Sequence, residues 1–341
     1  MGSLEQAVYA IIISFVIGVI LCPIVIPMLR KLKFGQNVRD DGPQTHLAKQ
    51  GTPTMGGVAF LAAFVITSLF FLKGNRDGAA IMLMTLCYGL IGFLDDYIKV
   101  VKKRSLGLRA YQKLLLQLIV TGLFCSYIMK SGIGTAIYIP FTDGKMIDLQ
   151  LIFIPFLFVA VLGTVNGVNL TDGLDGLAGG VTLLVAAFFM IVAWAAGSTI
   201  APVCGAIVGG LMAFLIFNSY PAKVFMGDTG SLTLGGIIAV FAIIIRKELL
   251  IPILCGIFLV ENLSVLMQTF YFKYTKKKYG EGRRIFKMAP LHHHFQKPGN
   301  AGIQALIQKP FNVVPESKIV VRFWLIGIIL AVIMIVTLKM R

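Results

Sequence analysis

The chain has 341 residues, of which 57% are hydrophobic and only 13% are charged. A soluble domain carries roughly 25% charged residues, so this composition excludes an ordinary globular protein or a soluble nucleic-acid-binding protein. The formal net charge is +16, and its meaning depends on where the basic residues lie relative to the apolar segments. The five cysteines are spread one per apolar segment without CxxC spacing, so neither a zinc site nor a disulfide framework is indicated.

Ten apolar runs divide the chain, and their lengths are close to the roughly 17 to 25 residues that an α-helix needs to cross a bilayer. The first run is too long for a cleaved signal peptide and lacks a small-residue cleavage site. Together the runs predict an all-α polytopic membrane protein with about ten transmembrane helices, forming a single integral-membrane domain over residues 1–341. The runs cover residues 7–28, 55–72, 79–97, 114–129, 149–165, 177–194, 200–217, 231–245, 249–272 and 319–340.

Two of these runs, ending at Val165 and beginning at Ser231, are short and border segments rich in Gly and Asp. Non-helical backbone at membrane depth is tolerated only where protein or water surrounds it, so we expect the ends of these runs to line an enclosed cavity. The segment 130–150 between the fourth and fifth runs contains Asp143-Gly144 among β-branched and aromatic residues, which predicts a small hairpin.

The basic residues favour one set of loops. When the segment after the first run is placed in the cytoplasm, the cytoplasmic loops hold 22 Lys or Arg and the opposite side holds 8. The positive-inside rule then places both termini outside the cytoplasm. The net charge is therefore mainly a topology signal, although it also favours anionic headgroups and phosphorylated substrates.

Five of only fifteen carboxylates lie at the predicted cytoplasmic ends of the runs: Asp95, Asp96, Asp172, Asp175 and Asp228. Ionisable groups at the bilayer boundary are costly unless they are paired, solvated or bound to a metal, so their convergence indicates a site. Carboxylates without matching arginines favour a divalent cation, and oxygen-only ligands favour Mg²⁺ over zinc. The alternative for a single residue is helix capping, which Asp172 or Asp228 could perform for the helix that follows.

Lysines and histidines accompany these carboxylates. GDTGS leads into a helix N-terminus, which attracts phosphate, but neither Asp-rich loop matches a nucleotide-binding spacing. Lys99 and Lys113 flank two helix ends and are candidates for binding a diphosphate, whereas the basic residues between them are interpreted as a solvated loop. Three consecutive histidines in APLHHHF cannot readily share one metal; they either direct one or two imidazoles to a phosphate or sugar, or form a polar interfacial turn.

Together these segments resemble the phospho-N-acetylmuramoyl-pentapeptide transferases, within the polyprenyl-phosphate N-acetylhexosamine-1-phosphate transferase superfamily. The superfamily shares the DD, NLTDGLDG and GDTGS elements, whereas GTPTMGG together with PLHHH resembles the muramoyl-pentapeptide branch. The resemblance implies ten transmembrane helices in the bacterial cytoplasmic membrane, with the active site facing the cytoplasm. The matching segments are DGPQTHLAKQGTPTMGG (41–57), GFLDDYIKV, NGVNLTDGLDGLAGG, FNSYPAKVFMGDTGSL, APLHHHF and IVVRFW.

The resemblance also implies a reaction, the first membrane step of peptidoglycan synthesis. Phospho-MurNAc-pentapeptide passes from UDP-MurNAc-pentapeptide to undecaprenyl phosphate, giving lipid I and UMP, with Mg²⁺ as cofactor. The implied partners are these two substrates and the lipid bilayer, without nucleic acid; a homodimer is compatible with the sequence, which leaves the oligomeric state open. The implied catalytic residues are Asp95, Asp96, Asp228 and His292, with Asp228 as the metal ligand. The implied substrate-binding residues are Lys49, Thr54, Lys99, Lys113, Asn169, Asp172, Asp175, Asn218, Phe225, Gly227, Gln268, His293 and His294.

Two roles stay open for Asp95 and Asp96, namely general base toward the lipid phosphate and electrostatic positioning. The second pKa of a phosphate monoester is near ~6, so the acceptor is already mostly a dianion at neutral pH. Because a base then has little to remove, the ionisation of the acceptor favours electrostatic positioning as the role of these two aspartates.

One segment departs from the family pattern, because residues 296–318 replace a link that is shorter by more than ten residues. Ile303, Leu306 and Ile307 in this segment predict a short amphipathic turn at the membrane surface. Two other functions remain open at this stage. One is a sister enzyme that transfers a simple N-acetylhexosamine phosphate, and the other is a secondary transporter with intramembrane carboxylates.

Overall fold

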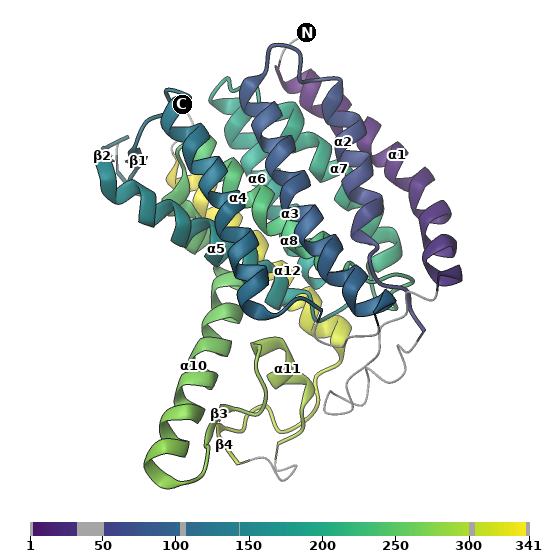
Figure 1. Ribbon diagram of the computed structural model, residues 1–341, viewed down its shortest axis with the longest axis vertical. Coiled ribbons are helices and arrows are strands. Elements are labelled where there is room, and N and C mark those ends of the chain that lie inside the picture. The colour runs from purple at the N-terminus through teal and green to yellow at the C-terminus, as the bar shows by residue number, and fades with distance from the viewer. Residues whose placement is uncertain (1–2, 33–50, 103–106, 143, 300–303, 339–341) are drawn as a thin grey trace.

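The computed structural model describes residues 3–32, 51–102, 107–142, 144–299 and 304–338. The described residues form a helical bundle with two small two-stranded sheets (Figure 1). The helices are α1 (Ser3–Lys31), α2 (Gly57–Leu69), α3 (Arg76–Val101), α4 (Ala110–Lys130), α5 (Phe153–Thr171), α6 (Leu177–Ala195), α7 (Ala201–Asn218), α8 (Gly227–Ile244), α9 (Ile251–Leu254), α10 (Gly256–Tyr279), α11 (Leu291–Gln296) and α12 (Glu316–Thr337). The strands are β1 (Ala136–Tyr138), β2 (Met146–Asp148), β3 (Arg284–Phe286) and β4 (Ala305–Ile307), and two short 3-10 turns cover Gln150–Ile152 and Glu248–Leu250.

Every one of the ten apolar runs contains a helix, which confirms the prediction of an all-α polytopic membrane protein. Within the described residues, eight helices are long and apolar enough to cross a membrane. A ninth span is possible if the segments Glu248–Leu254 and Gly256–Tyr279, bent by 75° at their junction, count as one. The helix in the remaining apolar run is α2, which has only 13 residues. At its start, the backbone amides of Gly56 and Gly57 donate to the carbonyls of Phe225 and Met226. The helix thus begins two residues after the start of the predicted run 55–72 and stops three residues before its end.

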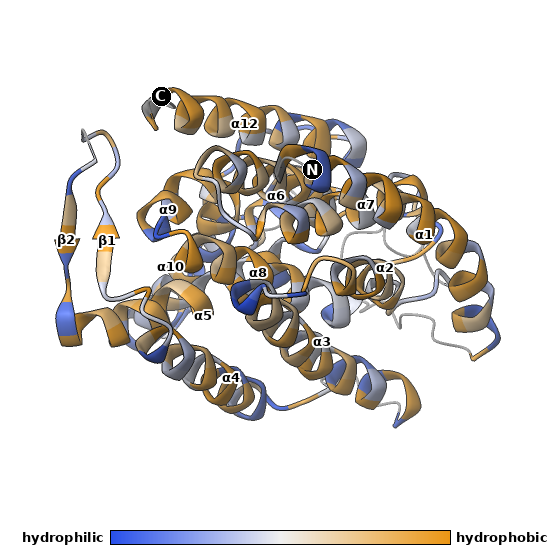
Figure 2. Cartoon of the chain, turned by 90° about the horizontal axis from the view of Figure 1, so that it is seen from above, coloured by the Kyte–Doolittle hydropathy of each residue, from blue (hydrophilic) through white to orange (hydrophobic). Residues whose placement is uncertain are grey.

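Helix α8 lies at the centre of the bundle, and 89% of its apolar window is buried inside the protein. Peripheral helices bury far less, with only 22% for α12. Hydrophobic residues predominate along α1, α3, α4 and α12 (Figure 2), and many of their large apolar side chains are exposed on the bundle. An apolar outer surface is what a lipid-embedded bundle presents. Protein therefore surrounds the run that begins at Ser231, whereas the cavity expected at its end stays a prediction.

The predicted hairpin is present, with β1 and β2 pairing antiparallel in the register Ile137 to Ile147. It lies beside the bundle next to α5 (Figure 2). Position 143, in the predicted turn, lies outside the described residues. The Nζ of Lys247 sits 3.3 Å from the centre of the Tyr138 ring, so a cation–π contact ties β1 to the segment after α8.

Helix α10 projects from the end of the bundle opposite to the start of α1 and the end of α12, and β3, α11 and β4 lie beside it (Figure 1). We call residues 280–315 the extension. Strand β3 pairs parallel with β4, with Phe286 opposite Ile307. The amphipathic turn predicted for this segment is wrong: residues 305–307 form a strand because β3 offers them backbone hydrogen bonds, and position 303 lies outside the described residues.

Close contact between α3 and α8 positions the carboxylates. A Cβ atom added to Gly92 would lie only 2.1 Å from the carbonyl oxygen of Asp228, so no side chain separates the two backbones there. The first turn of α8 therefore lies against the segment of α3 that carries Asp95 and Asp96. Glycine at such a position permits a backbone approach that any larger residue would prevent.

Candidate active site

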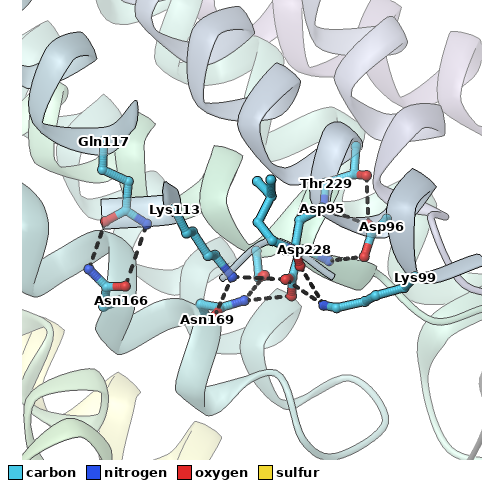
Figure 3. A network of polar contacts seen from close by, with 11 residues as sticks. Asp95, Asp96, Lys99, Lys113, Gln117, Asn166, Asn169, Asp228 and Thr229 are labelled. Carbon is cyan, nitrogen blue, oxygen red and sulfur yellow. Dashed lines mark hydrogen bonds and ion pairs between the residues drawn. The ribbon is translucent and has the colours of Figure 1, made fainter. Parts of the chain in front are cut away.

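An ion-pair cluster surrounds Asp228 at the start of α8 (Figure 3). Its Oδ2 accepts hydrogen bonds from Lys99 Nζ of α3 at 2.7 Å and from Lys113 Nζ of α4 at 2.8 Å. Lys99 Nζ also pairs with Asp95 Oδ2 at 2.5 Å. The consecutive helices α3 and α4 thus meet the distant helix α8 around one carboxylate, whose side chain is only 16% exposed. The predicted convergence of Asp95, Asp228, Lys99 and Lys113 is present.

Asn169 supports the same carboxylate from α5. Its Nδ2 donates to Asp228 Oδ1 at 2.9 Å and to Ser231 Oγ at 2.8 Å, while its Oδ1 accepts from Lys113 Nζ at 3.2 Å. One turn earlier, the amide groups of Asn166 and Gln117 pair reciprocally and join α5 to α4 (Figure 3). These pairings explain why α5 continues through the polar sequence NGVNLT to Thr171, beyond the predicted end at residue 165.

Asp96 has a different environment from its neighbour Asp95. Its Oδ1 accepts from the backbone N–H of Asp228 at 3.1 Å, and its Oδ2 accepts from the backbone N–H and the hydroxyl of Thr229 at 2.8 and 2.7 Å. These donors belong to the first turn of α8, whose amides lack partners within the helix. Asp96 therefore caps α8 from outside the helix, a role that the sequence had suggested for Asp228 itself.

Asp95 faces the ion-pair cluster and also holds the connection to α4. Its Oδ1 accepts from the backbone N–H of Leu108 at 2.7 Å, two residues before α4 begins. The side chain is buried, and its other oxygen carries the ion pair with Lys99. Asp95 thus links the end of α3, the start of α4 and the cluster around Asp228.

The same carboxylates could hold a metal ion. One oxygen from each of Asp95, Asp96 and Asp228 lies within 4.8 Å of the others, and a set of carboxylate oxygens suits Mg²⁺. The ammonium groups of Lys99 and Lys113 also pair with Asp228. The arrangement therefore fits a cation whose charge is shared with lysines that can turn toward phosphate oxygens.

The second Asp-rich loop, between α5 and α6, is largely built into the scaffold. Asp175 Oδ2 accepts from the backbone N–H of Ala222 at 3.0 Å. Asn218 accepts from the backbone N–H of Gly176 at 3.2 Å and donates to the carbonyl of Val224 at 2.9 Å. These bonds join the 172–176 loop to the 219–226 loop.

Asp172 directly follows the last residue of α5, in the loop between the membrane-spanning helices α5 and α6. Burial, together with the negative charges of Asp228 and Asp96, raises the pKa of the Asp172 carboxyl to about 8. At neutral pH the folded protein therefore keeps this carboxyl mostly protonated, unlike an ordinary aspartate.

Three residues predicted to surround the nucleotide lie on the segment that leads into α8 or contact it. The backbone N–H of Phe225 donates to the carbonyl of Pro53 at 2.8 Å, which brings Thr54 to this loop. A Cβ atom added to Gly227 would lie 2.7 Å from Asp96 Oδ2 and 2.9 Å from Thr54 Oγ1. Lys49 lies outside the described residues.

A third group of predicted residues lies on α10 and the extension. The Oε1 of Gln268 accepts from the backbone amides of Ile285 and Phe286, both at 3.0 Å, and its Nε2 donates to the carbonyl of Phe286 at 3.1 Å. Gln268 therefore anchors β3 to α10. A pocket of about 480 Å³ beside it is lined by Gln268 and by basic residues that include Lys273, Arg284 and Lys297.

The three histidines of α11 point in different directions, as expected for neighbours on a helix. His294 uses both ring nitrogens: Nδ1 accepts from the backbone N–H of Lys287 at 3.1 Å, and Nε2 lies 2.7 Å from the carbonyl oxygen of Lys309. His293 pairs with Gln296 through Nδ1 at 2.8 Å. His292 is fully buried beside Glu261 and Gly173, which connects the extension to the loop that carries Asp172.

Several residues around the site were missed by the sequence reasoning. Glu261 was detectable, because it is an ionisable residue inside the apolar run 249–272. Lys287 was hidden among many basic residues of a loop, although its side chain is completely buried. The polar partners Gln117 and Asn166 carry no signal that distinguishes them from other uncharged residues near helix ends.

The fold and the site define a polytopic membrane transferase with a carboxylate and lysine centre at one end of its helical bundle. The sequence profile of glycosyl transferase family 4 matches residues 78–246, and a signature of the phospho-N-acetylmuramoyl-pentapeptide-transferases matches residues 49–61.

Relatives named phospho-N-acetylmuramoyl-pentapeptide-transferase align with nearly the whole chain. The protein of Parabacteroides distasonis is 48% identical over 97% of this chain and 93% of its own length. Those of Clostridioides difficile and Caldicellulosiruptor bescii are 48% and 46% identical, and each alignment covers 98% of this chain and nearly all of the relative. The chain belongs to the phospho-N-acetylmuramoyl-pentapeptide-transferase family.

Proposed function

We propose that the protein transfers phospho-MurNAc-pentapeptide from UDP-MurNAc-pentapeptide to undecaprenyl phosphate, forming lipid I and UMP. The observation that carries this proposal is the pairing of Asp228 with Lys99 and Lys113 at the ends of membrane helices. Two lysines and a cation-binding set of carboxylates suit a reaction between a diphosphate and a phosphate, because such transfer depends on positioning and charge neutralisation. The identity of the two substrates is inferred from the family to which the chain belongs.

The residues of the cluster have different roles in this proposal. Lys99 and Lys113 bind phosphate oxygens of the donor and the acceptor, and Asp95 keeps Lys99 in place. Asp96 acts through α8, whose first turn it caps. Asp228 and Asp95 would hold Mg²⁺, which would supply positive charge against the negative charge of a diphosphate.

The location follows from the chemistry of the acceptor. An isoprenoid phosphate keeps its chain in the bilayer and its headgroup at the interface, and the cluster lies at helix ends. We place the protein in the bacterial cytoplasmic membrane with this end facing the cytoplasm, where the uridine nucleotide is available.

The test supplies purified protein with UDP-MurNAc-pentapeptide and undecaprenyl phosphate, with and without Mg²⁺, and measures UMP. We expect UMP and lipid I in equal amounts only when both substrates and Mg²⁺ are present. When UDP-GlcNAc replaces this donor, no UMP should form. Release of UMP from UDP-GlcNAc in the presence of undecaprenyl phosphate, but not from UDP-MurNAc-pentapeptide, would indicate the sister activity. Substrate accumulation in sealed vesicles without UMP release would indicate a transporter.

Asp228→Asn tests the metal role. The change keeps the shape of the side chain and removes its charge, so we expect the rate to fall at least about 100-fold while the protein remains folded in detergent. Loss of one ligand should also raise the Mg²⁺ concentration needed for half-maximal rate by about 10-fold or more. An Asp228→Asn enzyme with near-normal rate and unchanged Mg²⁺ dependence would rule out the ligand role.

A further inference from the structure

A buried acid and imidazole pair joins α10 to α11. The side chain of Glu261 is 1% exposed and that of His292 is completely buried. Glu261 Oε1 accepts the backbone N–H of His292 at 3.1 Å, and Oε2 lies 3.2 Å from His292 Nδ1. A carboxylate inside an apolar helix is costly unless it has such partners, so its presence at this position calls for a role.

The two ring nitrogens of His292 face different surroundings. Nδ1 faces Glu261, whereas Nε2 points at Gly173, where an added Cβ atom would lie only 2.2 Å away. Both ring nitrogens are buried, and neither makes a well-directed hydrogen bond to the residues that the structure describes; they differ in that Nδ1 has Glu261 Oε2 at 3.2 Å as an ion-pair neighbour. Only glycine leaves room for the ring at this point, next to Asp172 in the loop between α5 and α6.

We propose that Glu261 is a positioning residue that holds the proton of His292 on Nδ1 and thereby presents Nε2 as a proton acceptor to the Asp172–Gly173 segment. The proton goes to the nitrogen that faces an acceptor, and Glu261 Oε2 is the acceptor within reach of Nδ1. Glu261 also fixes the backbone of His292, so one carboxylate sets both the place and the tautomer of the imidazole. A buried acceptor without a partner is unfavourable, which prepares Nε2 for an O–H or N–H group of a substrate.

The catalytic part of this inference rests on the proposed transferase function, whereas the tautomer can be measured without it. The chain contains only four histidines, so ¹⁵N-histidine NMR of the purified protein can assign His292 by comparison with His292→Ala. We expect the parent protein to carry the proton on Nδ1. In Glu261→Gln the amide can still accept the backbone N–H through its oxygen while its NH₂ group donates to Nδ1, so the proton should move to Nε2. A parent protein with the proton on Nε2 would overturn the proposal even if the transferase assay succeeds.

The kinetic test uses the same variant. Loss of a correctly oriented proton acceptor costs about 10²-fold or more, so we expect Glu261→Gln to lower kcat by about 100-fold, with the donor KM changed by less than about 3-fold. In a His292→Ala background the same change should cost almost nothing, because residues that act through one another are not additive. The matched control is Glu248→Gln, which alters another buried glutamate, on the 3-10 turn before α9.

Three outcomes would contradict the proposal: kcat within 3-fold of the parent, equal losses in both backgrounds, or a fall in activity that merely follows a fall in Tm. If Glu261→Gln does not fold, Glu261→Asp replaces it, because it keeps the charge. We expect Glu261→Asp to retain the Nδ1 proton and a measurable rate, and a proton on Nε2 in that variant would also contradict the proposal. A parent that releases no UMP would reject the transferase function alone.

Discussion

Asp95 and Asp96 are adjacent in the chain, yet their side chains do different work. Asp95 pairs with Lys99 in the ion-pair cluster, whereas Asp96 accepts three hydrogen bonds from the first turn of α8. The sequence motif DD predicts a shared site but cannot assign these roles, because residues one position apart on a helix point about 100° apart. The donors to Asp96 come from α8, more than a hundred residues further along the chain, whereas the partners of Asp95 lie within 13 residues of it.

This difference predicts separate effects on stability. Asp96→Asn replaces one acceptor oxygen by an NH₂ group that faces an N–H donor, so it should lower the free energy of unfolding by about 1–3 kcal/mol. Asp95→Asn loses the ion pair with Lys99, which is partly exposed and therefore contributes less. Thermal unfolding of both variants in detergent, without divalent cations, measures the difference. Equal Tm values for the two variants would show that the cap contributes no more than the ion pair.

The raised pKa of Asp172 predicts a pH dependence of stability. An unfolded aspartate titrates near 3.8, whereas the folded carboxyl titrates at about 8. Between these values the folded state holds a proton that the unfolded state has released, so the contribution of Asp172 to the free energy of unfolding falls as pH rises from about 4 to about 8 and is constant above that. Asp172→Asn lacks this proton equilibrium, so we expect its Tm to exceed that of the parent by an amount that widens from pH 6 to about pH 8 and changes little from there to pH 9.

The measurement is thermal unfolding in EDTA from pH 6 to pH 9, so that no metal alters the titration. Glu281→Gln, at an exposed position of the extension, serves as the control and should follow the parent throughout. If Asp172→Asn also follows the parent at every pH, Asp172 titrates as an ordinary aspartate.

At the scale of elements, the extension depends on Lys287. Its side chain is completely buried, and its Nζ donates to the carbonyls of Lys297 at 2.5 Å and Pro310 at 2.6 Å. Burial lowers the pKa of Lys287. Because His294 binds both the backbone of Lys287 and the carbonyl of Lys309, the two side chains fasten the segment after α11 to the histidine helix.

Lys287→Met therefore tests whether the longer segment supports the site. The variant keeps the length of the side chain but leaves two carbonyls without their donor, which should cost about 1–3 kcal/mol. We expect faster proteolysis between residues 297 and 310 and a donor KM raised by about 10-fold, because α11 is no longer held firmly. Lys318→Met, at an exposed position of α12, is the control. If proteolysis and the donor KM are unchanged in Lys287→Met, the extension does not contribute to substrate binding.

The elements also show how far the sequence predicts the fold. Hydropathy located a helix in each of the ten runs, because a bilayer selects long apolar segments. It placed the start of α8 and the end of α5 several residues inside their true bounds, because polar residues there remain helical when neighbouring helices supply partners, as Asn166 and Gln117 do. It missed β4, whose conformation depends on pairing with β3 across the chain.

For the whole molecule, the remaining prediction is its orientation in the membrane. The ion-pair cluster lies at the end of α3 and the start of α8. The end of α3 and the helix α11 lie toward one end of the bundle, whereas α1 begins and α12 ends at the other (Figure 1). The loops predicted to be cytoplasmic hold 22 of the 31 basic residues. The positive-inside rule therefore predicts that the end with the cluster faces the cytoplasm.

Single cysteines introduced into a cysteine-free background test this orientation with a membrane-impermeant maleimide applied to intact cells. We expect Lys73→Cys and Lys145→Cys, both at exposed positions, to react from outside. Lys223→Cys on the loop before α8 and Glu281→Cys on the extension, also at exposed positions, should react only after the cells are opened, because charged reagents do not cross the bilayer. Reaction of Lys223→Cys and Glu281→Cys from opposite sides would place the cluster and His292 on different faces, and a single active site could not then contain both.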